Sequence, residues 1–115
     1  MSTNHAYVVV GSHGEYSDRR VFVVATYGRR SEARRHVRRV SRLVRTIVKI
    51  LNENQVPLGS FGGTMARQDI ADRAIEHAMR HRRLLGLTRR DIKYLVPYFD
   101  TERTWYWVEA TPFIR

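Results

Sequence analysis

The feature that most constrains the fold is a long segment, residues 31–54, whose apolar residues recur at alternating steps of four and three. This spacing places them on one face of an α-helix of about 22 residues, roughly 33 Å long. The predicted apolar face comprises Ala33, Val37, Val40, Val44, Ile47 and Leu51. We expect this face to pack against a sheet, although the same spacing is compatible with a homodimer seam. Ser31 is the expected N-cap of the helix, with Glu32 at the positive end of its dipole.

Three other segments have the composition of β-strands. Residues 6–11 and 21–27 are short, apolar and β-branched, and the loop Ser12–Arg20 joins them as a hairpin. The aromatic and β-branched segment 104–110 predicts a third strand. The first two strands have too few polar residues for one of their faces to be exposed to solvent. This favours a sheet that is covered on both sides, or a central position for these two strands.

Two further helices are expected between the long helix and the last strand. One follows the possible cap Thr64 and ends at Gly86, and a short one follows the cap Thr88 and ends before Pro97. The predicted order is therefore ββ-α-α-α-β. It indicates a single α+β domain over residues 1–115, with a three-stranded, mostly antiparallel sheet, helices on one face, and the last strand paired with the opening hairpin.

Composition narrows the class of protein. The chain has 115 residues, the size of one domain, and no cysteine. The absence of cysteine favours a reducing compartment. No apolar run approaches the roughly 18 residues of a membrane-spanning helix. We therefore expect a cytoplasmic protein that binds no membrane, and we expect it to use no cofactor or metal.

Charge is distributed very unevenly along the chain. The net charge is +10, and residues 29–49 carry nine basic residues against one acid, Glu32. Most of these cations fall on the helix face opposite the apolar one, along roughly 21 Å. The predicted polyanion-binding residues are Arg34, Arg35, Arg38, Arg39, Arg42, Arg45 and Lys49. An ordinary solvated helix face mixes both signs of charge, so this face predicts a partner that neutralises it: nucleic acid, a nucleoprotein complex or an acidic host protein surface.

Weaker signals lie further along the chain. A second basic cluster comprises Arg80, Arg82, Arg83, Arg89 and Arg90. The segment "GSFGGT" before a helix suggests either a linker, which we favour, or an anion site. The secondary candidates for binding an anion or nucleotide are Gly62, Gly63, Thr64, Arg67 and Tyr106. In the last strand Trp105 and Trp107 share one side, which we expect to be core, leaving Tyr106 exposed.

Other patterns favour structural roles over chemistry. His77 and His81 are four residues apart, as two metal ligands on a helix can be, but there is no third ligand and the neighbouring arginines repel a cation. The segment "HRRLLGLTRRDIKYL" has the length of a helix-turn-helix, yet Pro97 cuts its second helix short. The loop of residues 11–20 contains His13, but no spacing of nucleophile and base is recognisable. We interpret this loop as a hairpin turn that binds, if it is functional, rather than catalyses.

The segment "AYVVVGSHGEYSDRRVFVVATYGRRSEA" resembles the start of a diffuse group of small phage and bacterial proteins of unknown function. The residues that carry the resemblance are Tyr7, Val8, Tyr16, Ser17, Asp18, Val21, Ser31, Glu32 and Ala33. The closing "WVEATPF" is similar to their last strand. The resemblance covers roughly residues 6–37 and 104–113, and it implies a fold and an origin in a phage, not a reaction.

These observations favour a small non-enzymatic binding protein that docks nucleic acid or a nucleoprotein complex through its arginine-rich helix face. One alternative is an anti-defence inhibitor, comparable to anti-CRISPR proteins, that covers an acidic surface of a host protein. The positive net charge of the chain excludes an inhibitor that acts by mimicking DNA. The other alternative is a binder of a small anionic nucleotide.

Overall fold

The computed structural model describes residues 4–14, 19–53 and 63–113. Strands β1 (Asn4–His13), β2 (Arg20–Tyr27) and β3 (Thr104–Phe113) form one sheet in the order β2-β1-β3, and both pairs are antiparallel. The last strand therefore pairs with the opening hairpin, which confirms the predicted α+β architecture. All three strands extend beyond the predicted segments because the ladder continues at least to the pairs Asn4–Phe113 and His13–Thr104.

The long amphipathic segment forms α1 (Arg30–Asn52), as its spacing predicts. The prediction that Ser31 caps this helix is wrong. The cap position belongs to Arg29, whose side chain makes no capping hydrogen bond. The backbone N–H of Ala33 donates to the Arg29 carbonyl oxygen at 3.3 Å, so the helix begins early enough to leave Ser31 inside its first turn.

The second half of the chain contains α2 (Gly63–Arg80), α3 (Arg82–Leu85), α4 (Arg89–Leu95) and the short 3-10 helix η2 (Val96–Tyr98). The predicted continuous helix up to Gly86 is interrupted at His81. Gly86 ends α3 with a φ of 70°, and a Cβ built on it would lie 2.7 Å from Val24 of β2. The break thus allows the chain to turn back onto the sheet. Thr88 caps α4 as expected, because its hydroxyl accepts from the Asp91 N–H at 3.1 Å.

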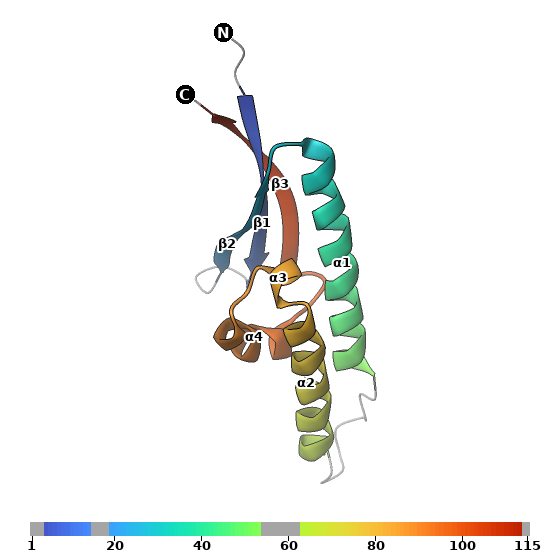
Figure 1. The fold of residues 1–115 in the computed structure, drawn as a ribbon. Helices are drawn as coiled ribbons and strands as arrows, with labels where there is room; N and C mark the ends of the chain where they lie inside the picture. Colours follow the sequence, from blue (N-terminus) through green and yellow to red (C-terminus); the bar gives the residue numbers. More distant parts are fainter. Residues whose placement is uncertain (1–3, 15–18, 54–62, 114–115) are drawn as a thin grey trace.

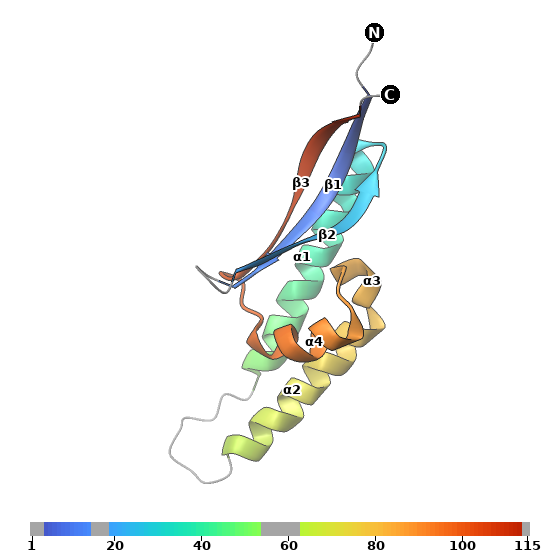
Figure 2. The ribbon, with the colours of Figure 1, turned by 90° about the vertical axis from the view of Figure 1, so that its left-hand side faces the viewer.

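α1 and α3 pack against one face of the sheet, and α2 and α4 lie beyond its end, on the same side as α1 (Figures 1 and 2). The first part of α1 runs along the sheet, and its later part runs beside α2 (Figure 1). The fully buried side chains join these layers into one core. They include Val9 from the sheet, Val40 and Ile47 from α1, and Leu85, Ile92 and Val96 from the later helices.

The two faces of the sheet differ in character. A bulge between Val9 and Val10 gives β2 one extra residue opposite β1, so Val24 and Ala25 both contact the core. On the other face Val21, Val23 and Trp105 are more than half exposed, and no helix of the described residues covers them. Helices on one face are therefore confirmed, and a sheet covered on both sides is not what the described residues form. None of the described helices is long and apolar enough to cross a membrane.

Candidate anion-binding surface

The basic face of α1 is fully available to a partner. All seven predicted residues are exposed, while Val40, Val44 and Ile47 on the opposite side of the helix are buried. We call the exposed cations of α1 the basic stripe: Arg34, Arg35, Arg38, Arg39, Arg42, Arg45 and Lys49. The helix is held on the core by its apolar side, so the stripe is presented outward on a rigid element.

The stripe is not neutralised by the described part of the chain. The ion pairs among the described residues join Arg20 to Asp91 and Arg80 to Glu76, both at 2.8 Å, and neither involves α1. Just before the stripe, the Arg30 guanidinium lies 5.3 Å from the centre of the Tyr7 ring. Since like charges three and four positions apart on a helix repel one another, an anionic partner would relieve a cost that the folded protein carries.

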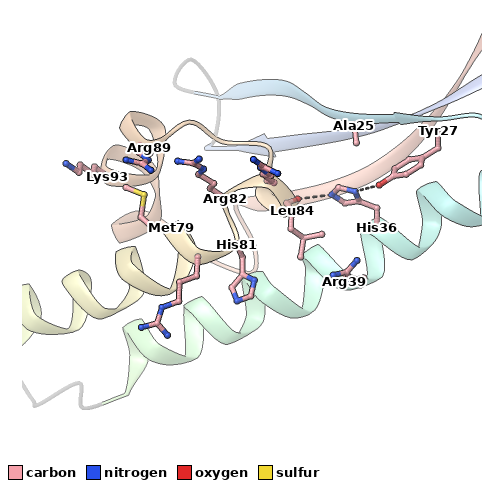
Figure 3. Close-up of a pocket in the computed structure, with 12 residues that line it drawn as sticks. Ala25, Tyr27, His36, Arg39, Met79, His81, Arg82, Leu84, Arg89 and Lys93 are labelled. Carbon is pink, nitrogen blue, oxygen red and sulfur yellow. Dashed lines mark hydrogen bonds between the residues drawn. The ribbon is translucent and has the colours of Figure 1, made fainter.

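A basic cleft lies beside the stripe, between α1, β2 and the later helices (Figure 3). Its volume is about 1110 Å³. None of its lining residues is acidic. Six cationic side chains line the cleft: Arg39, Arg80, Arg82, Arg83, Arg89 and Lys93. In Figure 3, Arg82, Arg89 and Lys93 gather at one side of the cleft and Arg39 lies towards the other. Arg39 therefore belongs both to the stripe and to the cleft, which makes the two one continuous basic surface.

His36 organises the wall of this cleft. Its Nε2 lies 2.8 Å from the Leu84 carbonyl oxygen, which can only accept, so Nε2 carries a proton. In the neutral ring Nδ1 then accepts from the Tyr27 hydroxyl, also at 2.8 Å (Figure 3). These bonds tie α1 to β2 and to α3. His36 was not among the residues predicted from the sequence, although its position three residues after Ala33 and four before Val40 fits the buried face of the helix.

The predicted orientation of the last strand is wrong. Tyr106 is buried and Trp105 is 59% exposed, the reverse of the expectation. The physical reason is the register: Tyr106 pairs with Gly11, and a Cβ at Gly11 would lie 2.9 Å from the Tyr106 ring. The missing side chain makes room for the phenol, whose hydroxyl donates to the Leu85 carbonyl oxygen at 2.8 Å. Burial raises the pKa of Tyr106, and the residue cannot stack on a nucleotide.

Most of the secondary anion candidates lie outside the described residues. Gly62 and the side chains of Thr64 and Arg67 lie outside the described residues, and Gly63 begins α2. Tyr106 contacts Leu85, which lies beyond the other end of α2, about 26 Å along that helix. An anion site at the "GSFGGT" segment stays a prediction, to which the buried Tyr106 adds no exposed ring.

The histidines show no metal-binding arrangement among the described residues, where no three His, Cys, Asp or Glu side chains converge. The rings of His77 and His81 lie 5.1 Å apart. Burial, His81 and Arg80 together lower the pKa of His77. His13 is buried, and its Nδ1 lies 2.9 Å from the Thr104 hydroxyl. Glu15 and Asp18 of the same loop lie outside the described residues.

The helix-turn-helix interpretation has little structural support. The two segments concerned are α3, of four residues, and α4, of seven.

Comparison with known proteins gives no match, whether to family models, to curated proteins or to solved structures. The function must therefore be argued from this surface itself.

Proposed function

We propose that this protein binds nucleic acid, free or within a nucleoprotein complex, through the basic stripe of α1. The observation that supports the proposal is the exposed row of cations on α1, unpaired with any described carboxylate. Nucleic-acid phosphates supply evenly spaced negative charge, and arginine binds them with two parallel hydrogen bonds.

The dimensions of the stripe fit this partner. Arg35 and Lys49 are 14 residues apart, which corresponds to about 21 Å along the helix. Phosphates follow one another every 3.4 Å or so along the axis of one strand, and a straight helix of this length faces several of them. Such contacts position the protein without reading the bases, so the proposal is one of binding with little sequence preference.

The basic cleft extends the contact sideways. Arg39 continues the stripe into a concave region with five further cations, contributed by α2, α3 and α4. A strand that runs along α1 could place additional phosphates there. The resemblance of the opening hairpin to small phage and bacterial proteins favours a phage or another mobile element as the source, and the cytoplasm as the compartment.

The proposal is tested by reversing charge on the stripe. In the double variant Arg38→Glu, Arg42→Glu both positions are exposed, and the new carboxylates lie beside arginines of neighbouring turns. The helix is therefore expected to remain folded. The matched control Arg73→Glu, Arg90→Glu changes net charge equally at exposed positions outside the stripe and the cleft lining.

We expect the stripe variant to lose binding to labelled DNA and RNA at least tenfold more than the control does. Equal losses in both variants would mean that only net charge matters, and would overturn the assignment to α1. Unchanged, weak binding in both, together with capture of an acidic protein, would favour the inhibitor alternative.

A further inference from the structure

The sheet presents an apolar surface on the side away from the helices. We call it the outer sheet face: Val10, Ser12, Val21, Val23, Trp105 and Trp107. The register forms two cross-strand rows. Trp105, Ser12 and Val21 make one row, and Trp107, Val10 and Val23 make the next. The central strand is covered, since Ser12 is 1% exposed, whereas the flanking Val21 and Val23 are 56% and 67% exposed.

This surface is laid out asymmetrically. Both tryptophans of the chain stand on β3, at one edge of the sheet, and both exposed valines stand on β2, at the other edge. Soluble monomers seldom leave neighbouring large apolar side chains uncovered unless they have a binding role. The helices that pack against the strands, α1 and α3, lie on the other face (Figure 2).

Charge on the outer sheet face argues against a nucleic-acid occupant. Glu109 accepts from the Trp107 indole N–H at 2.9 Å, and Glu102 lines a pocket together with Trp105. Two carboxylates beside the exposed Trp105 and the half-buried Trp107 would repel phosphate. Arg19, which precedes β2, lines the same pocket, and its Nε donates to the Ser12 hydroxyl of the central strand at 3.0 Å. Arg19 therefore enters this pocket from the β2 end of the sheet and Glu102 from the segment before β3, so one base and one acid lie at this end of the face.

We propose that the occupant of the outer sheet face is a second copy of this chain. A two-fold axis parallel to β1, between two sheets packed face to face, places the β3 edge of each copy over the β2 edge of the other. Trp105 then faces the second copy's Val21, and Trp107 faces its Val23. Arg19 comes opposite Glu102 of the second copy, because both lie at the same end of the sheet.

This arrangement is also compatible with the high net charge. The basic stripe and the basic cleft belong to the helical side, so a contact through the sheets keeps the two cationic surfaces on the outside of the dimer. The dimer would display two α1 stripes, which strengthens binding to a long polyanion by multivalency. The contact itself does not depend on the proposed function.

The test is sedimentation equilibrium over a wide range of protein concentration, with tryptophan emission as a second measurement. Both tryptophans lie on the outer sheet face, so dimerisation is expected to shift their emission to the blue and to protect them from acrylamide. Val23→Glu is expected to weaken the dimer at least tenfold. The control Tyr98→Glu alters a side chain that is 72% exposed on η2 and should leave the dimer unchanged.

A charge swap makes the test independent of packing defects. Arg19→Glu and Glu102→Arg should each weaken the dimer, and mixing the two single variants should restore it, because only a contact between copies is then matched in charge. A monomer at every concentration, or a dimer that survives Val23→Glu, would overturn the proposal. Either result would leave the nucleic-acid assay unaffected, so the two proposals fail separately.

Discussion

The Tyr106 hydroxyl donates a hydrogen bond of 2.8 Å to the Leu85 carbonyl oxygen and so joins β3 to the end of α3. Both groups are buried. Among the described residues, the Leu85 carbonyl oxygen has no second hydrogen-bond donor beside the Tyr106 hydroxyl. Tyr106→Phe removes the donor and is expected to lower the free energy of unfolding by about 1–3 kcal/mol. Denaturant unfolding measures this change. Tyr98→Phe, at a side chain that is 72% exposed, should change it by less than about 0.5 kcal/mol.

Gly86 and Val24 define a second point where α3 approaches the sheet. Gly86 has a φ of 70°, and an added Cβ would meet the Val24 side chain at 2.7 Å and its Cα at 2.9 Å. Gly86→Ala is therefore expected to cost at least about 2 kcal/mol, from the left-handed backbone and the clash together. Gly28→Ala meets no atom within 4 Å and should change stability by less than about 1 kcal/mol. Equal effects in thermal unfolding would contradict this packing.

Thr88 and Ser31 both lie at the start of a helix, but replacement by alanine is expected to change the stability of the protein differently at the two positions. Thr88→Ala removes the hydroxyl that accepts from the Asp91 N–H and should destabilise the protein by about 1 kcal/mol. Ser31→Ala should have almost no effect, because Ser31 lies inside the first turn of α1 and does not cap it. A larger loss at Ser31 than at Thr88 in chemical denaturation would show that α1 begins elsewhere.

The lowered pKa of His77 predicts a dependence of stability on pH. Burial, with smaller contributions from His81 and Arg80, disfavours the protonated ring in the folded state. The unfolded chain therefore takes up the proton more readily, and its pKa is about 6.5. Stability is complete above that pH and decreases as the pH falls through the lower pKa of the folded state. His77→Gln should show a smaller loss of melting temperature between about pH 7.5 and pH 5 than the wild type.

Much of the fold follows from the sequence because its signals are local. The spacing from Ala33 to Leu51 predicts α1, and the Thr88 cap predicts α4. The break at His81 was not predictable, since it depends on the contact between Gly86 and Val24, which are far apart in the chain. Sequence patterns identify elements better than they identify how these elements meet.

The orientation of β3 shows the same limit. Alternation establishes that Trp105 and Trp107 share a side, but not which side faces the core. The answer depends on the pairing of Tyr106 with Gly11, which is known only from the register. For the basic stripe the sequence was sufficient, because charge and helical spacing are both local. The basic cleft was not predicted as a whole, because Arg39 and Lys93 come from separate helices that tertiary packing brings together.

The dependence of nucleic-acid binding on salt concentration tests the function of α1 most directly. Five phosphate contacts along the stripe predict that the logarithm of affinity for double-stranded DNA falls against the logarithm of salt concentration with a slope of about −4.5. The slope should collapse in the Arg38→Glu, Arg42→Glu variant and persist in the Arg73→Glu, Arg90→Glu control. A shallow slope in the wild type, or the same slope in both double variants, would contradict the claim that α1 is a nucleic-acid-binding surface.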